Sequence, residues 1–259
     1  MNILDSIIEN KRKEIAERKR KCPIEALSKT VRKSTRSLKD ALQTHEKSKI
    51  NLIAEIKKAS PSEGVLRPHL ENELPDIVAL YNRYASAISV VTDEKFFQGM
   101  LEWIKKIRTL THLPILCKDF IIDEYQIYEA RAYRADAILL IAAALDEAKL
   151  KNYIKTARML GMDSLVEAHS QDEIHTALNA GANIIGINNR DLSTFAVNIE
   201  TTVRLAHSIP PDIVTVSESG FSSKGAVQRV ADLVDAVLIG TIFMKTPADI
   251  GKTITELGF

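Results

Sequence analysis

From Ile50 onward, short apolar runs alternate with longer segments in which apolar residues recur every three or four positions. The short runs are rich in β-branched residues and predict buried strands, whereas the longer segments predict amphipathic helices. The predicted strands span residues 50–56, 87–92, 113–119, 137–142, 163–168, 183–189, 212–218 and 235–240. The predicted helices span residues 73–85, 98–110, 123–134, 145–161, 170–181 and 223–233. This alternation is typical of a parallel sheet with helical crossovers.

The number and spacing of these units favour one α/β architecture. Eight strand units in about 210 residues fit a closed (β/α)8 TIM barrel. An open doubly wound sheet is the alternative, but such sheets usually have fewer strands and often carry a glycine fingerprint. The sequence contains no such fingerprint, and it contains no low-complexity segment or linker. We therefore predict a single barrel domain over residues 1–259.

Residues 1–45 stand outside this alternation and predict a helical extension that packs against the barrel and covers its mouth. The first part has apolar residues on one side of a helix, at Ile3, Leu4, Ile7, Ile8 and Ile15. A second short helix is predicted over residues 24–31. The basic run 11–21 is either a nucleic-acid-binding arm or a solvated helix face. Because Glu14 and Glu17 interrupt the run, we predict a solvated face.

Composition and charge exclude several classes of protein. The 35 Lys and Arg residues nearly balance the 34 Asp and Glu residues, so no global field favours nucleic acid or an acidic membrane. No run of about 18 apolar residues predicts a membrane span. The N-terminus has no apolar signal core. Cys22 and Cys117 form no metal or redox motif, and we expect both to be reduced thiols in a cytoplasmic protein.

Charged and polar residues collect at the C-terminal ends of the predicted strands. Side chains alternate along a strand, so Glu55 and Lys57 share a face with Ile53. Two charges on a buried face are unfavourable unless they are paired or used. The same parity applies at the ends of other strands, and in a barrel these ends face the active-site mouth. The resulting candidate set is Glu55, Lys57, Lys118, Glu167 and Asn188.

This set suits acid–base chemistry. A lysine beside a carboxylate stays protonated and can act as a general acid, and a partly desolvated glutamate can shuttle a proton. Each residue alone has a simpler interpretation, since a strand-end lysine usually lies at the surface and Asn188 could cap a turn. Their joint placement on the inward parity favours function. The sequence shows no Ser-His-Asp arrangement and no metal-ligand spacing, so we expect no metal.

Two glycine-containing loops follow the seventh and eighth predicted strands, in "SESGFSSKG" and "LIGTIF". In barrels these loops often bind a phosphate through backbone amides. Gly220 and Gly240, with Thr241, therefore favour a phosphorylated ligand.

The sequence resembles the indole-3-glycerol-phosphate synthase family over nearly its whole length. The resemblance rests on "AEIKKASPSEG", "LPILCKDFIIDEYQI", "LVEAHS", "IGINNRDLSTFAV", "SESGFSS" and "LIGTIFMKTP". Membership implies a carbon–carbon lyase of tryptophan biosynthesis. Such an enzyme closes the indole ring of 1-(2-carboxyphenylamino)-1-deoxyribulose 5-phosphate, with loss of carbon dioxide and water. The family needs neither a cofactor nor a metal.

The resemblance also implies roles for the candidate set. Lys118 would be the general acid that protonates the substrate's carbonyl oxygen, and Glu167 would be its acid–base partner through dehydration. Lys57 would hold the substrate's carboxylate or a hydroxyl, or act as a further acid. Glu55 and Asn188 would orient these groups.

Further positions match the family's substrate-binding residues. The phosphate would be bound at Ser60, Gly220, Gly240 and Thr241, with Glu218 and Ser219 lining the same mouth. The anthranilate ring would lie against Phe97, Phe120 and Leu139, for which plain core packing is the alternative. Arg190 and Leu192 lie in the matching loop.

Two other functions remain open from the residues alone. One is another phosphate-binding barrel enzyme, such as a phosphoribosylanthranilate isomerase or an aldolase that uses Lys118 as a Schiff-base nucleophile. The other is a non-catalytic barrel that binds a phosphorylated metabolite or a partner protein. Because a binding module needs few proton donors and acceptors, we favour the synthase. We expect a monomer that binds a phosphorylated small molecule, and neither nucleic acid nor a membrane.

Overall fold

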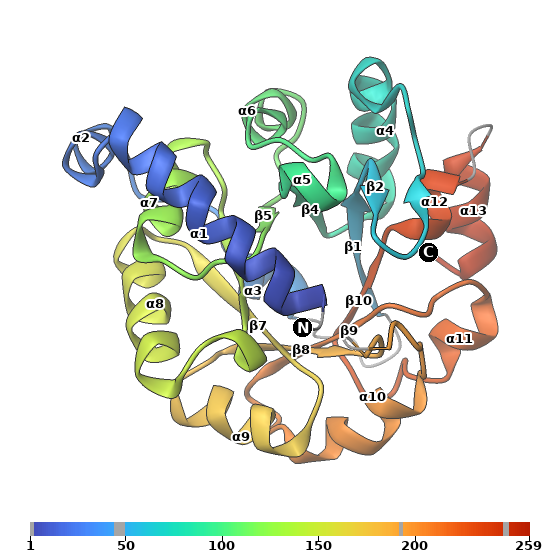
Figure 1. Cartoon of the computed structure of the whole chain (residues 1–259). Coiled ribbons are helices and arrows are strands. Elements are labelled where there is room, and N and C mark those ends of the chain that lie inside the picture. Colours follow the sequence, from blue (N-terminus) through green and yellow to red (C-terminus); the bar gives the residue numbers. More distant parts are fainter. Residues whose placement is uncertain (1–2, 44–49, 192–193, 246–248) are drawn as a thin grey trace.

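The computed structural model describes residues 3–43, 50–191, 194–245 and 249–259. Within these residues, eight parallel strands follow one another around a closed barrel, and the last pairs with the first (Figure 1). They are β1 (Asn51–Ile56), β4 (Ala87–Val91), β5 (Ile115–Lys118), β6 (Ala137–Ile141), β7 (Asp163–Ala168), β8 (Ile184–Asn188), β9 (Val214–Glu218) and β10 (Ala236–Ile239). A short antiparallel hairpin, β2 (Ala59–Ser60) and β3 (Gly64–Val65), follows β1. The predicted (β/α)8 barrel is confirmed.

Helices surround the barrel on its outer side (Figure 1). They are α4 (Leu70–Tyr84), α5 (Glu94–Phe97), α6 (Glu102–Arg108), α7 (Glu124–Ala132), α8 (Glu147–Met159), α9 (Gln171–Asn179), α10 (Glu200–Leu205), α11 (Lys224–Gln228), α12 (Thr241–Lys245) and α13 (Ile250–Leu257). Two 3₁₀ turns, η1 (Ala142–Ala144) and η2 (Ala206–Ser208), complete the set described in this part of the chain. The sequence analysis did not predict α5, α10, α12 or α13.

The helix predicted over 98–110 begins later than expected. Gln98 has a left-handed backbone with φ of 51°, and Gly99 lies so close to β4 that a Cβ there would be 2.2 Å from the Val91 carbonyl oxygen. This tight turn ends α5, and α6 begins only at Glu102. The helix predicted over 223–233 is likewise shorter, since α11 ends at Gln228.

Two apolar layers hold the barrel. The larger one lies between the strands and the surrounding helices. The inner one fills the barrel with Ile53, Ala87, Leu116, Ala137, Leu139, Ile141, Leu165, Ile184, Val214, Val216, Ala236 and Leu238. Strand parity continues this inner face to the C-terminal strand ends, where polar side chains replace apolar ones. The strand register therefore places the polar set above a filled apolar core.

The N-terminal extension runs from one end of the barrel to the other. Helix α1 (Ile3–Lys21) crosses the mouth, and α2 (Ile24–Thr30) packs beside α7 (Figure 1). Helix α3 (Leu38–Leu42) lies at the opposite end, where Leu38 and Leu42 join the inner apolar cluster. A cover over the mouth was predicted, whereas this plug at the base was not.

The side chain of Ser37 connects the plug to the barrel. It caps α3 by accepting the Asp40 N–H, and its hydroxyl donates to Asp163 at the start of β7 over 3.0 Å. The Lys39 N–H donates to the same carboxylate. These bonds fix α3 beneath the strands.

The prediction of a solvated face for the basic run 11–21 is wrong in part. Lys13 and Lys21 are exposed, but Lys11 is completely buried and Arg18 is half-buried. Buried carboxylates below α1 account for this difference, because they pair with cations that a sequence pattern alone assigns to solvent. Among the described helices, none is long and apolar enough to cross a membrane.

We predict that the plug stabilises the barrel. Leu38→Ala removes a fully buried side chain and leaves a cavity, so the free energy of unfolding should fall by about 2–5 kcal/mol. Leu110→Ala, at a leucine that is 37 % exposed, is the matched control and should change little. Urea denaturation measures both variants. Equal stability of the two would mean that α3 contributes nothing to the core.

Candidate active site

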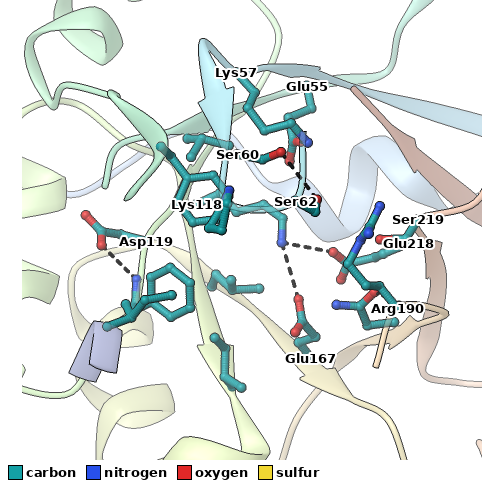
Figure 2. Close-up of a pocket in the computed structure, with 18 of the residues that line it drawn as sticks. Glu55, Lys57, Ser60, Ser62, Lys118, Asp119, Glu167, Arg190, Glu218 and Ser219 are labelled. Carbon is teal, nitrogen blue, oxygen red and sulfur yellow. Dashed lines mark hydrogen bonds and ion pairs between the residues drawn. The ribbon is translucent and has the colours of Figure 1, made fainter. Parts of the chain in front are cut away.

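Two adjoining cavities open at the C-terminal ends of the strands, and α1 covers the first of them. Figure 2 shows side chains that line the first cavity. The first is lined by thirteen of the predicted site residues: Glu55, Lys57, Ser60, Phe97, Lys118, Phe120, Leu139, Glu167, Asn188, Arg190, Glu218, Ser219 and Thr241. Gly220 and Gly240 line the second. The structure therefore brings these predicted residues together at one mouth. Leu192 lies outside the described residues.

The ammonium group of Lys118 lies between two carboxylates. Its Nζ is 3.3 Å from Glu167 Oε2 and 3.1 Å from Glu218 Oε2 (Figure 2). These side chains come from β5, β7 and β9 and point into the barrel from three directions. Burial disfavours the charged lysine, but the carboxylates outweigh it, Glu218 most of all, and the pKa of Lys118 lies above its ordinary value. Lys118 is therefore an ammonium group at neutral pH.

Glu218 has the perturbed carboxyl group of this cluster. Burial raises its pKa to about 7, with repulsion from Glu167 adding to the shift although Lys118 opposes it. The carboxyl group fits because β8 has a glycine opposite it. A Cβ at Gly186 would lie 2.2 Å from Glu218 Oε1. The sequence analysis placed Glu218 only among the substrate-binding residues, because the distance to Lys118 depends on barrel closure.

Glu55, on the inward face of β1, forms an ion pair with Lys57, which directly follows the strand. Lys57 Nζ is 2.8 Å from Glu55 Oε1, and the Ser89 hydroxyl donates to Oε2 over 3.4 Å. Burial opposes ionisation of Glu55, but Lys57 and then Lys118 outweigh it, so the pKa of Glu55 lies below its ordinary value. Gly240 leaves room for this side chain, since a Cβ there would lie 2.6 Å from Glu55 Oε1.

The second cavity lies between the loops that follow β1, β8, β9 and β10. Its cationic side chains are Lys57, Arg190 and Lys245. Two of them form ion pairs within the lining, Lys57 with Glu55 over 2.8 Å and Lys245 with Glu63 over 2.6 Å. Ser219 and Gly220 have left-handed backbones, with φ of 68° and 94°. Successive turns of this kind can direct backbone N–H groups toward an anion. The combination of amides and cations suits a phosphate group.

A buried asparagine fixes this loop. Asn189 Nδ2 donates to the Ser219 carbonyl and to Ser217 Oγ, each over 3.0 Å. Its Oδ1 accepts from the N–H and the hydroxyl of Thr202. All polar groups of the Asn189 side chain are thus satisfied. Its bond to the Ser219 carbonyl fixes the left-handed backbone of that residue.

The first cavity also has an apolar wall. The rings of Phe97 and Phe120 pack with centroids 6.0 Å apart, and Leu139 lies on the same lining. Helix α1 adds Ile3, Leu4 and Ile7. An aromatic group bound here would be covered by the N-terminal extension.

Comparison with known proteins agrees with this geometry. The family model described as indole-3-glycerol phosphate synthase matches residues 4–257. The chain belongs to the indole-3-glycerol phosphate synthase family.

Several relatives carry that name. The protein of Thermoanaerobacter pseudethanolicus is 43 % identical over 96 % of this chain and 95 % of its own. That of Caldanaerobacter subterraneus subsp. tengcongensis is 45 % identical, with 94 % and 93 % covered. The Burkholderia ambifaria protein is 46 % identical, with 94 % of each chain covered. A crystal structure of 3-hexulose-6-phosphate synthase matches with a TM-score of 0.64 at 12 % identity, over 80 % of this chain and 98 % of that one. At that identity it shows the shared fold alone.

The sequence analysis missed some residues at this mouth. Ser89 has the inward parity of its strand, so alternation alone could have identified it. Phe195 lines the first cavity from the loop after β8, and no periodic signal marks it. Asn189 has the opposite parity to Asn188, so its side chain does not point into the barrel. It bonds to the backbone of the loop that follows β9. Among the described residues, no group of three or more His, Cys, Asp or Glu is arranged to hold a metal ion.

We predict that Glu218 makes stability depend on pH. Its pKa is about 7 when folded, against an ordinary value of 4.5, so the folded state binds the extra proton between these values. The contribution of Glu218 to stability is therefore complete below 4.5 and is lost as the pH rises through about 7. The stability of the parent protein relative to Glu218→Gln should fall over this interval. Urea denaturation of both proteins from pH 4.5 to 8 measures the difference; a constant difference would contradict the prediction.

Proposed function

We propose that this mouth catalyses the decarboxylating and dehydrating ring closure of 1-(2-carboxyphenylamino)-1-deoxyribulose 5-phosphate to indole-3-glycerol phosphate. The observation that carries the proposal is the Lys118 ammonium between Glu167 and Glu218, in a mouth with an apolar wall and a cationic second cavity. The substrate has an aromatic ring, a carbonyl group and a phosphate in the same succession. Membership of the family supports this assignment.

The ends of the substrate are assigned by their chemistry. The phosphate occupies the second cavity, near the left-handed Ser219 and Gly220 and the cations Arg190 and Lys57. The anthranilate ring lies against Phe97, Phe120 and Leu139, where the apolar wall and α1 exclude water. The ketone then lies between these ends, beside Lys118.

The first steps need an acid at the ketone. The Lys118 ammonium protonates the carbonyl oxygen as the ring carbon that bears the carboxylate attacks the carbonyl carbon. A carbon–carbon bond forms, and the former ketone becomes a hydroxyl. The carboxylate then leaves as carbon dioxide, and its bonding electron pair restores the aromatic ring. Positioned acids of this kind contribute about 10² to 10⁴ in rate.

The last step removes water. The hydroxyl leaves with a proton from an acid, and a base takes a proton from the neighbouring carbon to complete the indole. We assign this acid–base work to Glu167, which contacts Lys118 and can exchange protons with it. Lys57 holds the substrate's carboxylate or a hydroxyl, or acts as a further acid. Glu55 orients Lys57 through their 2.8 Å ion pair.

Asn188 is assigned to orient substrate hydroxyls. Its Oδ1 accepts the Arg190 N–H over 3.0 Å, which fixes the side chain at the end of β8. We also assign Ser60 and Thr241 to the phosphate; both line the first cavity, and Thr241 also lines the second. Since one chain supplies the whole set, we propose an active monomer. We also propose a cytoplasmic location, where thiols such as Cys22 and Cys117 stay reduced.

The charge state of Lys118 argues against the aldolase alternative. A Schiff-base lysine must be a neutral amine to attack a carbonyl, and such lysines have lowered pKa values. The carboxylates around Lys118 shift its pKa upward instead. Borohydride should therefore trap no adduct at Lys118.

We predict that Lys118→Met abolishes most turnover. The apolar side chain keeps the packing of the lysine stem but has no proton to donate, so turnover should fall by about 10² or more. Purified protein is mixed with the substrate and indole fluorescence is followed. Lys149→Met, at an exposed lysine on α8, is the control and should match the parent. If the parent is active and Lys118→Met is nearly as active, Lys118 has no part in the mechanism. If the parent itself is inactive, the proposed reaction is refuted.

A further inference from the structure

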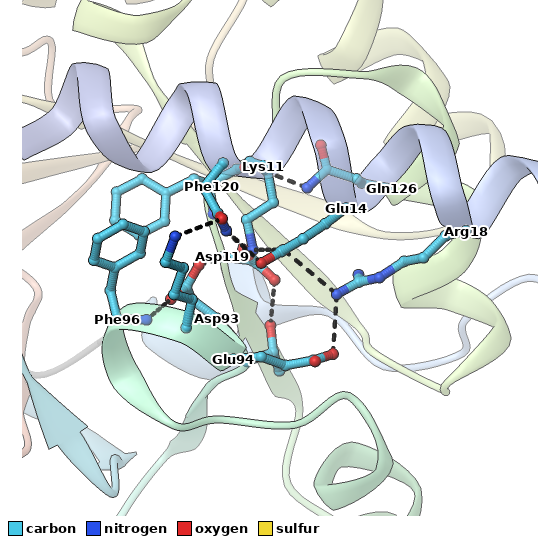
Figure 3. A network of polar contacts seen from close by, with 12 residues as sticks. Lys11, Glu14, Arg18, Asp93, Glu94, Phe96, Asp119, Phe120 and Gln126 are labelled. Carbon is cyan, nitrogen blue, oxygen red and sulfur yellow. Dashed lines mark hydrogen bonds and ion pairs between the residues drawn. The ribbon is translucent and has the colours of Figure 1, made fainter.

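Lys11 is a buried cation whose partners lie at the edge of the active site. It is 0 % exposed on α1, whereas Lys13 on the same helix is 74 % exposed. On α1 itself, Glu14 Oε2 lies 3.1 Å from the Lys11 Nζ. The Nζ also lies 2.8 Å from both Asp93 Oδ2 and Asp119 Oδ1 (Figure 3). Burial disfavours the ammonium, but these two carboxylates outweigh it, and the pKa of Lys11 is raised. The charge is therefore held between the strand ends of β4 and β5.

Asp93 determines where Phe97 lies. Its Oδ1 caps α5 by accepting the Phe96 N–H over 2.8 Å, and its carbonyl accepts the Gly99 N–H over 2.8 Å. These bonds close both ends of the four-residue helix that carries Phe97. A helix this short has little stability of its own, so the cap decides its conformation.

Asp119 determines where Phe120 lies. It follows Lys118 directly and points away from the Lys118 ammonium (Figure 2). Its Oδ1 accepts the Phe120 N–H over 2.7 Å, and its Oδ2 accepts from the Thr92 hydroxyl over 2.9 Å. The carboxylate thus fixes the backbone at the exit from β5, from which the Phe120 ring extends.

We propose that Lys11 is a positioning residue for the aromatic wall of the active site. Its ammonium joins the two carboxylates that place Phe97 and Phe120, and it holds them at the spacing at which the rings pack. The same helix brings Ile3, Leu4 and Ile7 over these rings. Lys11 therefore sets the part of the mouth that receives the substrate's aromatic ring, an inference that rests on the proposed function.

Other contacts hold α1 itself. Arg18 lies 3.1 Å from Glu129 on α7 and 3.0 Å from Glu94 on α5, and Lys19 lies 2.7 Å from Asp123. The pairs with Glu129 and Asp123 attach α1 to the region of α7, and the pair with Glu94 attaches it to the first residue of α5. Removal of Lys11 should consequently disturb the wall more than the attachment of the helix.

The test compares ligand affinity at the two ends of the substrate site. Lys11→Met leaves two buried carboxylates facing each other without their cation, so the rings should lose their spacing. We expect the inhibition constant of anthranilate to rise by about tenfold or more. The inhibition constant of inorganic phosphate should be unchanged, because the second cavity is built from other loops. Lys13→Met, on the exposed side of α1, should match the parent in both.

If Lys11→Met folds poorly, two Asp93 variants test the same role. Asp93→Asn keeps the Oδ1 that caps α5 but puts an amide NH2 in place of the Oδ2 that contacts Lys11. Asp93→Ala loses both contacts. Asp93→Asn should therefore lose anthranilate affinity, although less than Asp93→Ala. In both, Asp119 still anchors Lys11. Trypsin cleavage within residues 3–21 reports whether α1 has been released.

The outcomes separate the alternatives. Selective loss of anthranilate affinity, with α1 still protected from trypsin, supports the positioning role. Equal loss of anthranilate and phosphate affinity, parent-like anthranilate affinity of Asp93→Asn, or no loss in Lys11→Met would overturn it. Turnover by the parent protein tests the proposed reaction separately, so an inactive parent with selective anthranilate loss would refute the reaction and leave the Lys11 role intact.

Discussion

The ion cluster of Lys118, Glu167 and Glu218 is the constraint around which the mouth is built. A closed parallel barrel turns every second side chain inward, and near the C-terminal strand ends these inward positions carry charged side chains that line the cavities. Removing one partner from a buried ion pair typically costs about 3–5 kcal/mol, so each group needs the others. Gly186 and Gly240 follow from this need, because any Cβ there would displace a carboxylate.

Much of this arrangement could be predicted because it is local. Strand alternation gave Glu55, Lys118, Glu167 and Asn188 the same inward parity, and barrel closure then brought them to one rim. The loops after the last two strands could be predicted as phosphate-binding candidates from their glycines alone. The roles of these residues remain proposals, since parity fixes where a side chain points and says nothing about which proton it moves.

What could not be predicted depends on contacts between distant parts of the chain. Lys11 has the pattern of a solvated helix residue, and only the positions of Asp93 and Asp119, more than 80 residues away, explain its burial. Helix α3 is too short to give a periodic signal. Its role as a plug depends on the strands around it, because Leu38 and Leu42 pack into the inner apolar cluster. The raised pKa of Glu218 likewise depends on burial and on neighbours from other strands.

The N-terminal extension contacts both ends of the barrel. Its last helix fills the base of the barrel with Leu38 and Leu42, and its first helix covers the mouth through Lys11. At the base, Leu38 and Leu42 enter the apolar core and Ser37 bonds to Asp163, whereas at the mouth Lys11 pairs with Asp119, the residue that follows Lys118. A single segment thus stabilises the fold at one end and shapes the candidate site at the other. The two effects should separate on mutation, because the apolar and ionic contacts lie at opposite ends of the strands.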